Sequence, residues 1–164
     1  MDMTKIVWAV VVVVILGGGW LFTTGGMNKA YEQATKNLVG NNPEQDVIDE
    51  AVLSKYGGYN LSLFRYEQAK RFYSTSINRY GPTGKNYWWN LQQLALCEEN
   101  MENPQASVTI LYNLWLEDGD AYDERVSNRD QLALRITKLV KLNELRISDY
   151  PTDERTLRRL QRRR

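Results

Sequence analysis

Apolar and polar positions divide the chain into two parts. Residues 6–22 form an apolar run without a charged or amide side chain, whereas the rest of the chain carries many charges and no second apolar run of this length. As a helix the run measures about 25 Å, and with its flanks, residues 3–24, about 33 Å. This length matches the hydrocarbon core of a bilayer, so the pattern predicts a single transmembrane helix within an anchor of residues 1–26.

The two ends of the run carry side chains that favour the membrane interface. Trp8 and Trp20 lie near opposite ends, and indole rings are enriched at both interfaces of a membrane. Lys5 precedes the run and is long enough to extend its ammonium group to the headgroups. These three residues are therefore predicted to be part of the membrane anchor.

Three glycines, Gly17, Gly18 and Gly19, mark the second half of the run and belong to the same predicted anchor. They either let another membrane helix approach closely or are simply tolerated in the helix. A cleaved signal peptide is an alternative interpretation, because Lys5 followed by an apolar run looks like the start of one. No A-x-A cleavage site follows the run, so we expect a retained signal anchor.

The second part of the chain, residues 27–150, shows the apolar spacing of amphipathic helices separated by short breaks, and strand signals are poor. Consecutive helices with short loops predict an all-α fold of antiparallel helical hairpins. The predicted helices cover residues 27–39, 43–56, 61–79, 86–99, 104–117 and 130–146.

Asparagine, proline and glycine set the predicted helix boundaries. Asn42 and Asn103 each precede a proline, which suits an N-cap followed by the first helical position. Asn60 is expected to cap the third helix. The pair Gly57-Gly58 is expected to end the second helix, because glycine is a poor helix former.

The composition excludes several classes of function. The formal net charge is +1, but residues 151–164 hold six arginines against Asp153 and Glu154, so positive charge gathers in a C-terminal tail. There is no histidine and one cysteine, which removes the commonest general base and most zinc and haem sites. No phosphate loop, dinucleotide fingerprint or nucleophile elbow is present. We therefore expect no enzymatic activity, cofactor, metal site or small-molecule substrate.

Residues 66–117 resemble tetratricopeptide-like (TPR-like) helical repeats, in which small residues lie where two helices cross and large aromatic residues fill the space between. A cysteine near a helix end, followed by a polar loop, makes them similar to repeat proteins of the bacterial envelope. Gln92 stands at a usual glycine position, and Ser76 at a usual alanine. The resemblance implies a TPR-like domain over residues 27–150 that binds other proteins, and another kind of helical bundle is the alternative. The matching residues are Tyr66, Ala69, Tyr73, Tyr80, Gly81, Pro82, Trp88, Leu91, Ala106 and Ile110.

Adjacent aromatic residues supply the candidate partner-binding site of this domain. Tyr87, Trp88 and Trp89 follow one another on a helix, about 100 degrees apart, so they cannot all face one core. Trp88 holds the position that resembles the repeat core. Trp89 and Tyr87 are the predicted partner-binding residues, with simple packing as the alternative. Cys97 lies on an apolar helix face and is expected to be buried and unreactive.

Two charged segments need separate interpretation. In the tail, residues Arg155, Arg158, Arg159 and Arg162 recur at three- and four-residue spacing, which gathers them on one helix face. Such a face is either a solvated end, an anionic-lipid contact or a docking strip for an acidic protein or nucleic acid. The acidic segment 118–124 lacks the spacing of a calcium loop, so we interpret it as a helix end followed by a capped helix start.

Together these features predict a non-catalytic accessory or scaffold subunit of a membrane protein complex, which binds partner proteins through a helical-repeat surface. The alternative is a tether to anionic lipid or nucleic acid through the arginine-rich tail. The short N-terminal flank favours a cytoplasmic N-terminus. In a bacterium this topology implies an inner-membrane protein with its domain in the periplasm.

Overall fold

The structure, a computed structural model, describes residues 7–8 and 23–146. The described residues form helices, turns and loops without a strand, which confirms the predicted all-α fold for this part of the chain. The elements are α2 (Thr24–Thr35), α3 (Pro43–Ser62), α4 (Tyr66–Tyr80), the 3-10 turn η1 (Gly81–Thr83), α5 (Tyr87–Asn100), α6 (Pro104–Leu116), α7 (Gly119–Tyr122) and α8 (Arg129–Leu142).

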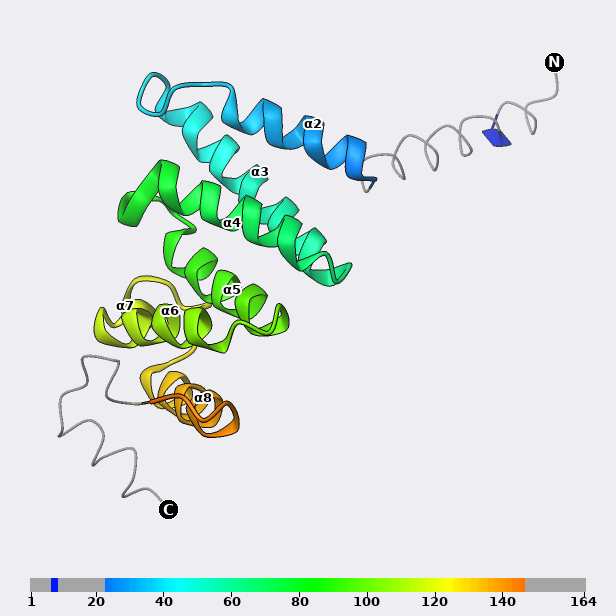
Figure 1. The fold of residues 1–164 in the computed structure, drawn as a ribbon. Helices are drawn as coiled ribbons and strands as arrows, with labels where there is room; N and C mark the ends of the chain where they lie inside the picture. Colours follow the sequence, from blue (N-terminus) through cyan, green and yellow to red (C-terminus); the bar gives the residue numbers. More distant parts are fainter. Residues whose placement is uncertain (1–6, 9–22, 147–164) are drawn as a thin grey trace.

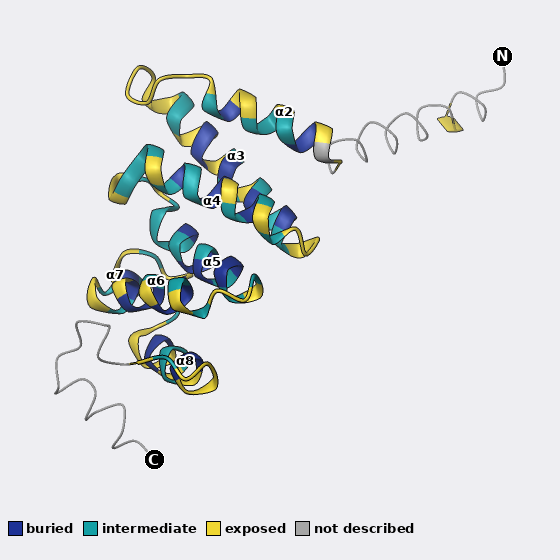
Figure 2. Cartoon of the chain, viewed as in Figure 1, coloured by how far each residue is buried: buried dark blue, intermediate teal, exposed yellow. Residues whose placement is uncertain are grey.

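The helices stack in chain order. Each long helix packs mainly on the one before and the one after it, and α2 and α8 lie at opposite ends of the stack (Figure 1). Such an arrangement makes each pair of helices depend on its neighbours for burial of its apolar face. Burial accordingly concentrates on α5 and α6, in the interior of the stack, while α2 and α8 expose much of their surface (Figure 2).

Within residues 7–8 and 23–146, no helix combines the length and the apolar character needed to cross a bilayer. Of the predicted anchor residues the structure describes Trp8, whose side chain is 65% exposed. The remaining anchor residues and the four predicted tail residues lie outside the described residues: Lys5, Gly17, Gly18, Gly19, Trp20, Arg155, Arg158, Arg159 and Arg162.

The helix α2 begins and ends earlier than its apolar pattern indicated. Thr23 caps it, because its hydroxyl accepts a hydrogen bond from the Gly26 amide at 3.3 Å, so the helix starts three residues before the predicted Met27. It ends at Thr35 instead of Val39. Residues 36–42 form a loop that is held to α3, where the Asp46 carboxylate accepts from the Gly40 amide at 2.8 Å.

The prediction that Gly57-Gly58 ends a helix was wrong, since α3 continues through both residues to Ser62. Packing against Tyr73 of α4 explains the difference. A Cβ on Gly57 would lie 2.7 Å from Cε1 of Tyr73, so this position needs glycine for close approach of the two helices. Asn60 is consequently not an N-cap: it is buried inside α3 and donates to the Tyr56 carbonyl at 2.9 Å. The next helix, α4, therefore begins at Tyr66 instead of the predicted residue 61.

The other predicted boundaries agree more closely. Asn42 and Asn103 cap α3 and α6 as expected, each accepting from a backbone amide three residues on. At the end of α8, Glu144 adopts a left-handed conformation with φ 51°, so the helix ends at Leu142 before the predicted Arg146. Such residues after a helix satisfy its last carbonyl groups.

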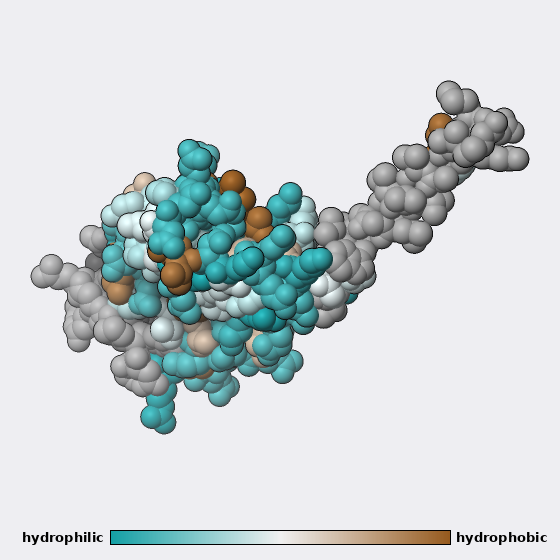
Figure 3. Space-filling view, turned by 90° about the horizontal axis from the view of Figure 1, so that it is seen from above, coloured by the Kyte–Doolittle hydropathy of each residue, from teal (hydrophilic) through white to brown (hydrophobic). Residues whose placement is uncertain are grey.

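Three buried clusters hold the stack together. The largest is aliphatic and joins α5, α6 and α8, with Leu111, Leu114 and Leu132 at its centre. A second is aromatic and joins α2, α3 and α4 around Phe72. Between them, Ala69 and Tyr73 of α4 meet Cys97 of α5. Seen from the α2 side, the surface is mostly hydrophilic with separated hydrophobic patches (Figure 3).

Candidate functional site

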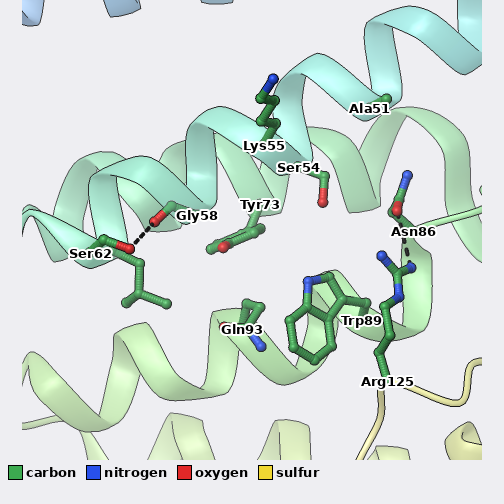
Figure 4. A pocket seen from close by; sticks show the side chains of 11 residues that line it. Ala51, Ser54, Lys55, Gly58, Ser62, Tyr73, Asn86, Trp89, Gln93 and Arg125 are labelled. Carbon is green, nitrogen blue, oxygen red and sulfur yellow. Dashed lines mark hydrogen bonds between the residues drawn. The ribbon is translucent and has the colours of Figure 1, made fainter. Parts of the chain in front are cut away.

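An open groove of about 430 Å³ lies between α3 and α5 (Figure 4). The residues of α3 that line the groove recur at three- and four-residue spacing, which places them on one face of the helix. On the α5 side, Trp89 and Gln93 follow the same rule, and Tyr73 of α4 closes the floor. The lining residues are Ala51, Ser54, Lys55, Gly58, Leu61, Ser62, Tyr73, Asn86, Trp89, Gln93 and Arg125.

Trp89 is half-buried and forms the aromatic part of the groove wall. The Arg125 guanidinium lies 5.5 Å from the centre of its ring, a cation–π distance. Arg125 is itself held in place, because it donates to Asp123 at 2.7 and 2.9 Å and to the Asn86 side-chain oxygen at 3.1 Å. The groove therefore presents a flat ring beside a fixed guanidinium group, whose charge is paired with the Asp123 carboxylate.

The charges of the groove have one sign. Lys55 projects from α3 on the opposite wall from Trp89, with its ammonium group 5.7 Å from the Tyr59 ring centre. Among the described residues that line the groove, Lys55 and Arg125 are the charged ones, and none is acidic. The hydrogen bond from Arg125 lowers the pKa of the Asp123 carboxyl, which favours the charged pair. The groove thus combines apolar surface with two cationic side chains, of which Arg125 is paired with Asp123 just outside the lining.

Carboxylates from two distant segments fix the start of α5, on which Trp89 stands. Glu50 of α3 accepts from the backbone amides of Lys85 at 3.0 Å and Asn86 at 2.6 Å. Asp123 receives a hydrogen bond from the Trp89 backbone, a further cause of its lowered pKa. The residue before α5, Asn86, makes no side-chain cap. Remote carboxylates therefore satisfy the amide groups at the positive end of this helix.

A chain of buried hydrogen bonds fixes the distance between the two walls. Ser54 of α3 donates to the Asn90 side-chain oxygen of α5 at 2.7 Å, and the Asn90 amide donates to Ser76 of α4 at 3.0 Å. Asn90 is fully buried. Ser76 and the neighbouring Gln92 are the two departures from the repeat pattern. Each has a partner here, because Gln92 accepts from the Ser127 amide at 2.7 Å.

The three adjacent aromatic residues separate as their spacing suggested. Trp88 packs against the aliphatic cluster and stacks on Tyr122 at 5.0 Å. Tyr87 lies edge-on to Trp88 and does not line the groove, so the structure brings only Trp89 of the two predicted partner-binding residues to the site. Cys97 is buried as predicted, and burial raises the pKa of its thiol to about 12.

The sequence patterns missed Ser54, Lys55 and Arg125 as groove residues. Ser54 and Lys55 lie inside the predicted second helix, but the lining face that continues through Gly58 to Ser62 was not visible, because that helix was expected to end at Gly57-Gly58. Arg125 lies in a loop, where no periodicity marks it. The acidic segment also differs, since Asp118 does not cap α7 and instead pairs with Arg129 at 2.7 Å.

Comparison with known proteins assigns no relative: no protein family, curated protein or solved structure matches the chain.

Proposed function

We propose that this protein is a membrane-anchored, non-catalytic accessory or scaffold subunit that binds a partner protein in the α3–α5 groove. The observation that carries the proposal is the groove itself, where Trp89 lies beside Arg125, Lys55 stands on the opposite wall and no acidic residue is in the lining. Aromatic and arginine residues in a concave surface are the typical anchors of a protein interface. The occupant expected is a partner segment with an apolar side chain and an acidic group.

The hairpin arrangement supports a TPR-like repeat as the scaffold. α3 with α4 and α5 with α6 form successive hairpins, and the small residue Ala69 is buried where α4 meets its neighbours. α4 and α6 begin at Tyr66 and Pro104, 38 positions apart, which is longer than the roughly 34 residues of a standard unit. We therefore propose a variant repeat whose first helices line one face.

The membrane anchor completes the proposal. Its support is the apolar run of residues 6–22, which has the length of a bilayer core and carries no charge. The second described range of the chain begins at Thr23, directly after this run, and enters α2 at once. An anchor so close to the domain keeps the groove near the membrane, where subunits of a membrane complex are found.

The test uses the full chain purified with its partners in mild detergent, followed by mass spectrometry and a binding titration with the partner found. Trp89→Ala is expected to weaken binding about thirtyfold, since loss of an interface tryptophan typically removes about 2 kcal/mol. Tyr122→Ala is the control, because Tyr122 is 69% exposed and lies outside the groove. Equal affinity of the two variants would contradict the proposal.

A salt series separates this function from the alternative tether. Groove binding depends mainly on the buried ring and changes little with salt. Binding of lipid or nucleic acid by the arginine tail falls steeply between about 50 and 200 mM salt, because counterions are released. A chain ending at Asp153 is expected to keep most of its affinity. Loss of binding in that chain, with Trp89→Ala unaffected, would favour the tether.

A further inference from the structure

The turn between α3 and α4 contains an aromatic residue in an unfavourable position. Phe64 has a φ of 58°, in the left-handed region, and its side chain is 77% exposed. The residue at this point after a helix is usually glycine or asparagine, because a Cβ and a bulky ring are disfavoured there. Leu63 beside it is also exposed.

The turn does not need this ring in order to form. Its hydrogen bonds are backbone bonds, from the Phe64 amide to the Leu61 carbonyl at 3.0 Å and from the Arg65 amide to the Asn60 carbonyl at 2.9 Å. The ring itself meets Tyr66 edge-on, with centroids 6.3 Å apart, and otherwise faces solvent. A strained and exposed aromatic residue of this kind indicates a role outside the fold.

The same turn lies next to the first turn of α2. The Arg65 guanidinium is 3.8 Å from the sulfur of Met27, which is fully buried. Figure 1 shows the start of α2 and the α3–α4 turn on the same side of the stack. Met27 lies five positions after Phe22, the last residue of the apolar run, so the two are no more than roughly 18 Å apart. The turn is therefore close to the membrane if residues 6–22 span it.

Basic residues outnumber acidic ones in the two segments that form this turn and the start of α2. Within residues 23–31 and 58–71 the cationic residues are Lys29, Arg65, Lys70 and Arg71, and Glu67 is the one acidic residue. Lys70 pairs with Glu98 at 2.9 Å, and Arg71 lies over the Tyr31 ring at 3.9 Å, with its guanidinium donating to Asn28. Basic residues around an apolar residue are the usual composition of a surface that contacts anionic lipid.

We infer that the α3–α4 turn is a second membrane-contact site, at which Phe64 and Leu63 enter the interface of an anionic bilayer and the neighbouring basic residues contact its headgroups. This inference rests on the proposed membrane anchor. Two points of attachment, the anchor and the turn, fix the tilt of the stack and so hold the α3–α5 groove in one orientation towards the membrane. A single flexible attachment leaves that orientation open.

The test places a fluorescent probe on the turn in the full chain. Phe64→Cys is labelled with an environment-sensitive dye and reconstituted into vesicles of phosphatidylcholine and phosphatidylglycerol, with or without lipid that carries a quencher near the headgroup. Leu38→Cys is the matched control, because Leu38 is 75% exposed and lies beyond the far end of α2, a helix about 18 Å long. The wild-type chain controls for labelling of Cys97, which is buried.

We expect quenching at position 64 to be at least twofold stronger than at position 38, and to weaken in vesicles of phosphatidylcholine alone. Equal quenching at both positions, in protein that floats with the vesicles, overturns the inference and leaves the anchor intact. Protein that does not float with vesicles at all overturns both the anchor and the inference. The two failures are therefore distinguishable.

Phe64→Asn tests whether the ring serves folding instead. Asparagine suits the left-handed conformation, so the variant is expected to unfold at the same or a higher temperature than wild type. In vesicles, an identical dye at Leu63→Cys is expected to lose at least half of its quenching when Phe64→Asn is added. A lower unfolding temperature together with unchanged quenching would assign the ring to the fold and contradict the membrane contact.

Discussion

The two central hairpins bury their interfaces in different ways. α3 and α4 meet through Gly57 and the Tyr73 ring, and through the Phe72 ring, which stacks on Tyr56 of α3 with ring centroids 6.0 Å apart. α5 and α6 instead share an aliphatic cluster with Leu111 and Leu114, both fully buried. An aliphatic core tolerates several side-chain arrangements of similar volume. A glycine packed against a ring instead sets one distance between the two helices. The groove lies where that distance matters.

The seam between the hairpins adds polar specificity. Ser54, Asn90 and Ser76 connect α3, α5 and α4 by two short hydrogen bonds, and Glu50 of α3 holds the start of α5. Buried polar groups of this kind are costly unless every partner is present, so they favour one alignment of the helices. The second hairpin therefore mainly supplies stability, while the first hairpin and the seam determine the geometry of the groove.

The largest effect is expected in the aliphatic hairpin. Leu111→Ala removes a fully buried side chain from the cluster of α5, α6 and α8. Core truncations of leucine typically lower the free energy of unfolding by about 2 to 5 kcal/mol. Urea denaturation followed by circular dichroism measures the change. Leu134→Ala, at a 69% exposed position of α8, is expected to change it by less than about 0.5 kcal/mol. Similar losses in both variants would contradict the assigned core.

A smaller effect with a sharper control comes from the glycine pair of α3. Gly57→Ala places a methyl group 2.7 Å from the Tyr73 ring, so we expect a loss of about 1 to 2 kcal/mol from overpacking. Gly58→Ala finds the Tyr73 hydroxyl at 3.6 Å, an ordinary contact, and is expected to gain about 0.5 to 1 kcal/mol from helix propensity. Thermal unfolding of both variants decides the matter. The same sign for the two would show that close approach at Gly57 is not required.

The seam is tested by removing one capping charge. Glu50→Gln keeps the shape of the side chain but weakens its hydrogen bonds to the amides of Lys85 and Asn86. A loss of about 1 kcal/mol is expected, as for other helix caps, together with weaker partner binding because Trp89 stands on the same helix. Glu117→Gln, at an exposed residue after α6, serves as the control and should leave both unchanged.

The prediction for Cys97 concerns the reactivity of its thiol, with no change in stability at neutral pH. Burial raises its thiol pKa from 9.0 to about 12, so the folded protein holds about a thousandfold less thiolate than an exposed cysteine. We expect negligible alkylation by iodoacetamide at pH 8 and rapid alkylation after denaturation in urea, measured by mass spectrometry. Rapid alkylation of the folded protein would show that the α4–α5 seam opens readily.

The raised pKa of the Cys97 thiol also predicts how stability changes at alkaline pH. Burial also raises the pKa of Tyr73, which touches Cys97 in one cluster. The folded state therefore retains protons that the unfolded state releases, so the free energy of unfolding is fully maintained below about pH 9 and falls as pH rises towards 12. Urea midpoints measured across this range check the direction. A midpoint that rises with pH would be inconsistent with two buried neutral groups.

Local signals in the sequence determined which parts of this protein are helical and where several helices begin. Asn42 and Asn103, each before a proline, predicted the two N-caps. Apolar spacing assigned Trp88 to the core and Trp89 to another face, because an α-helix has 3.6 residues per turn whatever packs against it. The burial of Cys97 followed from the same spacing. The apolar run of residues 6–22 predicts a membrane anchor by its length alone, a prediction that lies outside the described residues.

Only the tertiary structure decided that α3 continues through Gly57-Gly58, because the local preference of glycine against helix is about 1 kcal/mol and the contact with Tyr73 outweighs it. The continuation extends the lining face of α3 past Gly58 to Ser62, on the wall that faces α5. Arg125, from a loop without periodicity, reaches the same groove through its hydrogen bond to Asn86, 39 residues earlier in the chain. Contacts between residues so distant in sequence leave no local pattern, since they exist only once the hairpins have stacked.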